Sequence, residues 1–113
     1  MYEYTFAGFV YLKYDLSDII LMEDRVKILI TLIVRSKSPC YDQIREDLYN
    51  GFKDLAYGDT FGSILGKKGF LETIAKDSYG MFRDILSKFQ LSDIKVTVES
   101  DNYYKVGYNE NNG

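Results

Sequence analysis

The stretch Arg25–Val34, Arg-Val-Lys-Ile-Leu-Ile-Thr-Leu-Ile-Val, decides the fold of this chain. Its β-branched side chains are stiff at χ1 and pack well on the pleated surface of a strand. Strand alternation divides the stretch into one face with Val26, Ile28, Ile30, Leu32 and Val34 and a second face with Lys27, Leu29, Thr31, Ile33 and Arg35. The second face is also apolar through its middle. A strand that is apolar on both faces is usually covered on both, so we predict the central strand of a sheet, running to about Ser36.

Residues 2–14 alternate in the same way and predict the first strand, antiparallel to the central one. Gly8 in its middle predicts a bulge or a close backbone approach. Residues 92–100 alternate cleanly near the other end of the chain, and residues 103–108 follow as a short edge strand. The segment 15–24 between the first two strands is ambiguous, and we interpret it as a long connection that folds back onto the sheet.

Two amphipathic helices are predicted between these pairs of strands. Ser38-Pro39 is typical of a helix start, because Ser can cap and Pro fits the first helical position. Apolar residues recur at helical spacing from there to Gly58, and again from Phe70 to Phe89. The order is therefore ββααββ. We predict a single α+β domain over residues 1–108, an antiparallel sheet of about four strands with a two-helix hairpin on one face, and a disordered tail over 109–113.

The segment between the helices is rich in glycine, which predicts a flexible loop marked by Gly58, Gly62, Gly66 and Gly69. Part of this segment superficially looks like a phosphate-binding loop. Such a loop needs four residues between its glycines and a hydroxyl residue after the lysine, and here Lys68 stands in place of the hydroxyl. No strand leads into it either, so we predict no nucleotide site and no cofactor.

Composition excludes several chemistries. The chain has no histidine and one cysteine, Cys40, which removes Ser-His and Cys-His dyads, an internal disulfide and thiol metal clusters. A helix start can activate a thiol, but Cys40 has no histidine as its base, so we interpret it as a structural residue. The net charge of −3 gives no field that attracts nucleic acid. With no apolar run of membrane-spanning length and no signal peptide, we expect a cytoplasmic protein. Because these catalytic residues are missing, we favour a protein that is not an enzyme.

Acidic residues supply the alternative of a small metal-dependent nuclease or hydrolase. Four of them lie in the ambiguous connection: Asp15, Asp18, Glu23 and Asp24. Oxygen ligands suit calcium or magnesium, but the spacing does not match a calcium-binding loop, and we predict no metal site there. Asp93, Lys95 and Glu99 form a second, cruder acidic arrangement on one predicted strand.

Nucleic-acid binding is another alternative, and the sequence gives it little support. Basic residues near the first hairpin have aromatic neighbours on the adjoining strand: Lys13, Lys27, Arg35 and Lys37 with Phe9 and Tyr11. Acids are interspersed through the rest of the chain, so this arrangement lacks the clustered positive charge that a nucleic-acid surface needs.

The second face of the central strand therefore carries the functional prediction. If both helices cover Ile28, Ile30 and Leu32, the opposite face presents a patch larger and more apolar than a monomer normally leaves in water: Phe9, Tyr11, Leu29, Thr31 and Ile33. We expect a homodimer that associates through this uncovered face or through an edge strand, and that binds a protein partner through tyrosine-rich surface. The alternative is internal cover by residues 15–24 or by the C-terminal hairpin.

Abundant tyrosine, lysine and isoleucine without tryptophan suggest an AT-rich viral or mobile-element source and an effector of a host complex.

Overall fold

The computed structural model describes residues 1–13, 25–57, 68–100 and 104–110. Its elements are β1 (Tyr2–Lys13), β2 (Arg25–Ser36), α1 (Tyr41–Tyr57), α2 (Phe70–Ile85), β3 (Leu91–Ser100) and β4 (Lys105–Tyr108). The strands form one antiparallel sheet in the order β1-β2-β3-β4. This architecture confirms the predicted α+β class, the ββααββ order, the central position of β2 and its antiparallel pairing with the first strand.

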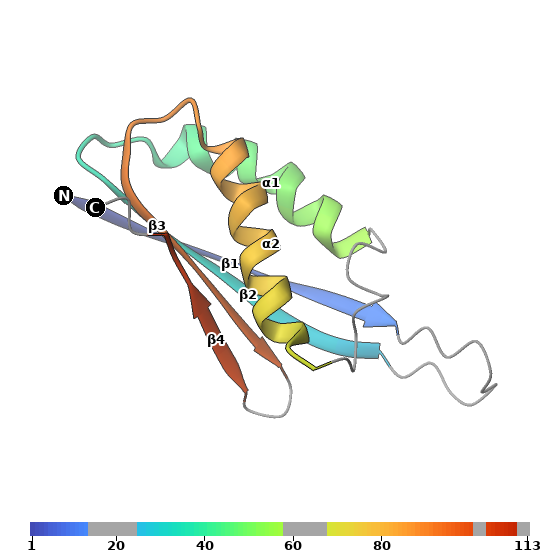
Figure 1. Cartoon of the computed structure of the whole chain (residues 1–113). Helices are drawn as coiled ribbons and strands as arrows, with labels where there is room; N and C mark the ends of the chain where they lie inside the picture. Colours follow the sequence, from blue (N-terminus) through green and yellow to red (C-terminus); the bar gives the residue numbers. More distant parts are fainter. Residues whose placement is uncertain (14–24, 58–67, 101–103, 111–113) are drawn as a thin grey trace, which may run out of the picture.

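Both helices lie on the same face of the sheet (Figure 1). The helix α1 packs against β1, whereas α2 packs over β3 and β4. Between helices and sheet lies the core, to which β2 contributes four residues that are completely shielded from solvent: Ile28, Ile30, Leu32 and Val34. The face of β2 that was predicted to meet the helices therefore does so, and the face with Leu29, Thr31 and Ile33 points away from them.

The helix α1 begins at Tyr41, later than the predicted start at Ser38-Pro39. The backbone carbonyl of Cys40 accepts a hydrogen bond from the Ile44 N–H at 3.1 Å, so Cys40 occupies the capping position. Ser38 is held in the preceding turn instead. The Ser36 hydroxyl donates to the Ser38 carbonyl at 2.8 Å and accepts from the Ser38 N–H at 3.2 Å, and this local pairing competes with a helix start.

Glycines mark two places where elements approach closely. A Cβ atom on Gly8 of β1 would lie 2.7 Å from Cδ1 of Phe52 in α1, so the close approach predicted there is observed, and the β1–β2 register continues through Gly8 without a bulge. At Gly51 a Cβ atom would lie 2.7 Å from Cδ1 of Ile85, where α1 crosses α2. At Gly80 of α2, by contrast, a Cβ atom would meet nothing within 4 Å.

Replacing Gly80→Ala is expected to raise the free energy of unfolding by about 0.5–1 kcal/mol, because alanine loses less backbone entropy in a helix and the site has room. The matched control is Gly51→Ala, which has the same intrinsic gain but forces Ile85 to move. Urea unfolding of the two variants measures the difference. Equal gains would contradict the close crossing of α1 and α2 at Gly51.

Candidate functional site

The outer face of the sheet, meaning the face turned away from α1 and α2, is the candidate site. Residues that are opposite in register share a face, so the register determines its rows. The rows across the sheet are Thr5–Ile33–Lys95, then Ala7–Thr31–Thr97–Gly107, then Phe9–Leu29–Glu99–Lys105. Together these rows bring residues from all four strands onto one surface.

The residues predicted for the interface meet on this outer face. Phe9 is 49% exposed, and its neighbours Leu29, Thr31 and Ile33 are half-buried. Tyr11 lies opposite Lys27 in the register, which places it on the same face, but its side chain lies outside the described residues. The register therefore assembles the set because strand alternation decides which side chains share a face.

The C-terminal hairpin does not cover this face, because β3 and β4 are strands of the same sheet (Figure 1). Neither helix covers it either, since both lie on the opposite face. Residues 15–24, the other predicted cover, lie outside the described residues. Within the described ranges, then, the outer face has no element packed over it.

The outer face is apolar on one side and polar on the other. We call its apolar part the open-face strip: Ala7 and Phe9 of β1 with Leu29 and Ile33 of β2. The strands β3 and β4 contribute polar and charged residues beside it, namely Lys95, Thr97, Glu99 and Lys105. The Lys95 stem lies over Gly107, whose added Cβ would come within 3.0 Å of Lys95 Cε. An apolar strip with a charged margin is the usual arrangement of a protein-binding surface.

Charged groups limit the open-face strip at both ends of β2. At one end, Arg35 Nε lies 3.0 Å from Glu3 Oε2, with both side chains more than half exposed. At the other end, Lys27 Nζ lies 4.0 Å from the centroid of the Phe9 ring, within the range of a cation–π contact. The two basic side chains thus lie near opposite ends of β2, and each already contacts a residue of β1.

No family model, curated protein or solved structure matches this chain. None of the helices in the described part of the chain is long and apolar enough to span a membrane.

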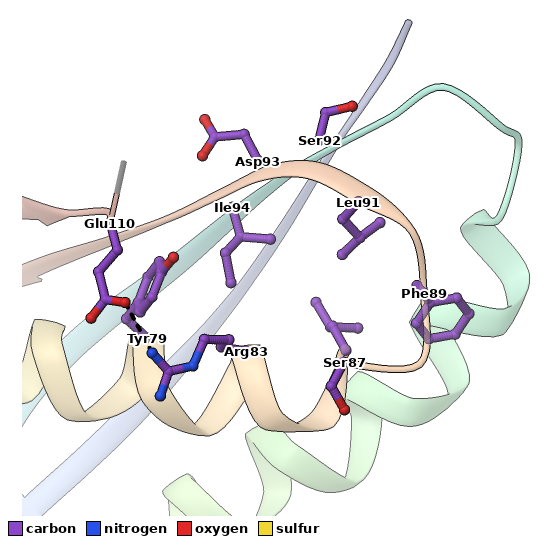
Figure 2. Close-up of a pocket in the computed structure, with 10 residues that line it drawn as sticks. Tyr79, Arg83, Ser87, Phe89, Leu91, Ser92, Asp93, Ile94 and Glu110 are labelled. Atoms are coloured by element: carbon purple, nitrogen blue, oxygen red, sulfur yellow. Dashed lines mark hydrogen bonds and ion pairs between the residues drawn. The ribbon is translucent and has the colours of Figure 1, made fainter. Parts of the chain in front are cut away.

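A hollow of about 470 Å³ lies between α2 and the start of β3 (Figure 2). Arg83 points toward Glu110, and its Nη1 lies 2.9 Å from Glu110 Oε2. The Tyr108 hydroxyl donates a hydrogen bond to Glu110 Oε1 at 3.0 Å, and this bond, with burial and the negative charge of Glu110, raises the pKa of Tyr108. Because Arg83 already forms an ion pair with Glu110, an anionic ligand entering the hollow would have to compete with Glu110 for the guanidinium group.

Cys40 lies beside two hydroxyl side chains, and the acidic candidates Asp93 and Glu99 share the outer face of β3 with Lys95. The Cys40 thiol lies 3.5 Å from the Ser36 hydroxyl. The backbone N–H of Cys40 donates a hydrogen bond to the Tyr4 hydroxyl at 3.3 Å. Among the residues that the structure describes, no three histidine, cysteine or acidic side chains gather in a way that could hold a metal. The acidic connection containing Asp15 and Asp24 lies outside those residues.

The predicted glycine loop also falls mostly outside the described residues, including Gly58, Gly62 and Gly66. Gly69 is described and precedes α2 with a φ of +76°. Glycine adopts this left-handed backbone without a steric penalty, so Gly69 serves the entry into α2.

A second surface is the free edge of β1. The sequence predicted an edge strand as an alternative route of self-association but did not identify β1 as that strand. This edge borders a hollow of about 870 Å³ between β1 and α1. The signal was present, because the alternation runs through the whole strand without proline. What the pattern did not show was that this strand stands at the edge of the sheet.

Proposed function

We propose that the chain is a non-enzymatic protein-interaction module that self-associates and binds another protein through its open-face strip. The observation that carries the proposal is the position of Phe9, Leu29 and Ile33 on a sheet face over which no described element packs. Removing such side chains from water is favourable in proportion to the apolar area, so a second protein that covers them gains binding free energy.

The margin of the strip supports the same proposal. Lys95, Glu99 and Lys105 of β3 and β4 place charges of both signs beside the apolar residues. Charged margins contribute more to partner selection and association rate than to affinity, whereas buried aromatic and aliphatic residues supply most of the affinity. Phe9 and Ile33 are thus proposed as the affinity residues and the β3–β4 charges as the selective ones.

Composition supports a finer part of the proposal. Eleven tyrosines, no tryptophan and abundant lysine and isoleucine are typical of an AT-rich source, such as a virus or a mobile element. We propose that the partner is then a protein of the host cytoplasm and that the chain acts by occupying a surface of a host complex. Tyrosine suits this role because it offers a large contact area with one polar end.

The double variant Leu29→Thr/Ile33→Thr tests the open-face strip. Threonine is β-branched and favoured in strands but has less apolar area than leucine or isoleucine, so the fold should persist while partner affinity falls about tenfold or more. The measurement compares the proteins that the tagged chain retains from an extract of its native cell. Tyr104→Ser is the matched control, since Tyr104 is exposed but lies outside the strip.

Proteins retained by the unmodified chain and by the Tyr104→Ser control, but lost from the double variant, would support the proposal. The same proteins on all three chains, or none on the unmodified chain, would contradict it. Urea unfolding of each variant confirms that the comparison is made between folded proteins.

A further inference from the structure

The free edge of β1 is unusually complete for an edge strand. All 12 residues of β1 pair with β2 in unbroken register, from Tyr2 opposite Ser36 to Lys13 opposite Arg25. No described strand pairs with the other side of β1. That side presents a long, regular row of backbone N–H and C=O groups, which is a template for pairing with another strand.

The opposite edge of the sheet is protected in the ways that natural proteins use. There β4 has only 4 residues, with Lys105 at its start. Short strands and lysines discourage pairing with other chains. By contrast, β1 has neither a proline nor a bulge, and its charged residues, Glu3 and Lys13, stand near its two ends. The difference between the edges indicates that β1 pairs with another strand.

The sequence of β1 is complementary to itself about Gly8. In an antiparallel pair of two β1 strands with Gly8 opposite Gly8, residues of the same face meet each other. The pairs on the outer face are Glu3 with Lys13, Thr5 with Tyr11 and Ala7 with Phe9, and on the helix face they are Tyr4 with Leu12 and Phe6 with Val10. Opposite charges meet at both ends, and a small residue meets a large one beside the axis. Each kind of pair favours an antiparallel ladder.

The hollow beside β1 lies where this pairing needs space. Its β1 lining is Thr5, Phe6, Ala7 and Gly8, which are four consecutive residues and so belong to both faces of the strand. A hollow that touches both faces lies at the edge. On the helix face, Phe52 of α1 already covers Gly8, so β1 presents only backbone at the centre of the pair.

We propose that two copies of this chain join through their β1 edges in an antiparallel pair centred on Gly8. The two sheets become one continuous sheet, with the helices of both copies on the same face. The two open-face strips then meet across the axis, where Phe9 of each copy lies beside Ala7 of the other. This inference rests on the proposed function, of which it specifies the self-association, and it leaves the bound partner to the open-face strip.

Charge reversal at the paired ends tests this arrangement. Glu3→Lys alone sets two lysines opposite each other, and Lys13→Glu alone sets two acids opposite each other. Because the pair occurs twice in the dimer, each single change should weaken self-association about tenfold or more. The double variant Glu3→Lys/Lys13→Glu restores opposite charges and should return the dissociation constant to within about threefold of its original value. Sedimentation over a range of concentrations measures each constant.

Arg35→Gln is the matched control, because it removes the same Glu3–Arg35 ion pair that Glu3→Lys removes. It leaves both paired ends of β1 unchanged, so self-association should not change. A chain that is monomeric at all concentrations, single variants that associate like the unmodified chain, or a double variant without recovery would overturn the inference. Loss of the dimer in Leu29→Thr/Ile33→Thr alone would also overturn it, but would leave the proposed function standing. If Glu3→Lys and Lys13→Glu still retain partner proteins although they no longer self-associate, partner binding does not depend on the β1 pairing.

Discussion

Phe82→Ala is expected to lower the free energy of unfolding by about 3–5 kcal/mol. Phe82 of α2 is 0% exposed, and its ring centroid lies 5.0 Å from that of Phe52 in α1. Truncation removes a large buried side chain and leaves a cavity at the point where both helices meet the sheet. Because domains of this size are stable by only about 5–15 kcal/mol, the variant should have a much lower urea midpoint.

Phe9→Ala is the control for this prediction, because it removes the same ring from the outer face. Phe9 is 49% exposed and contacts Lys27, so we expect a loss of about 1 kcal/mol or less. Urea unfolding of both variants gives the comparison. Similar losses would show that Phe9 is buried in solution and would refute an open outer face.

Ile30→Lys is expected to prevent folding. Ile30 is 0% exposed in the middle of β2 and faces the core between the sheet and the helices. An unpaired ammonium at this position costs several kcal/mol in desolvation, in addition to the lost apolar contacts. The sum is comparable to the whole stability of the domain, so circular dichroism should show no cooperative unfolding transition.

Thr31→Lys places the same side chain one residue further along β2, where it points to the outer face. We expect a folded protein with a stability change of about 1 kcal/mol or less, and weaker partner binding because a charge now lies within the open-face strip. A chain that unfolds equally in both variants would show that the outer face is covered.

The faces of the strands could be predicted because strand alternation is local. The apolar residues of both faces of β2, from Ile28 to Ile33, were assigned correctly from their spacing alone, and the close approach at Gly8 followed from its missing side chain. The start of α1 was misplaced because Ser36 captures Ser38 in a turn. This hydrogen bond depends on where β2 ends, which a capping pattern does not encode.

The candidate site was predictable to the same extent. The set Phe9, Leu29, Thr31 and Ile33 shares a face by alternation, and the structure brings it together. The order of the strands was not predictable, because pairing of β2 with β3 joins segments on either side of both helices. Without that order, nothing distinguished β1 as an edge strand, and its complementary ends at Glu3 and Lys13 had no evident meaning.

The pairing of β2 with β3 has a consequence during synthesis of the chain. The ribosome releases β2 before it has made α2 or β3, so the growing chain holds an apolar strand that can pair with β1 but lacks its second neighbour and its helical cover. Until β3 has been made, the free side of this strand can join foreign β-structure instead. We therefore expect soluble yield in cells to depend on translation speed and chaperone supply more strongly than the equilibrium stability of the finished domain suggests.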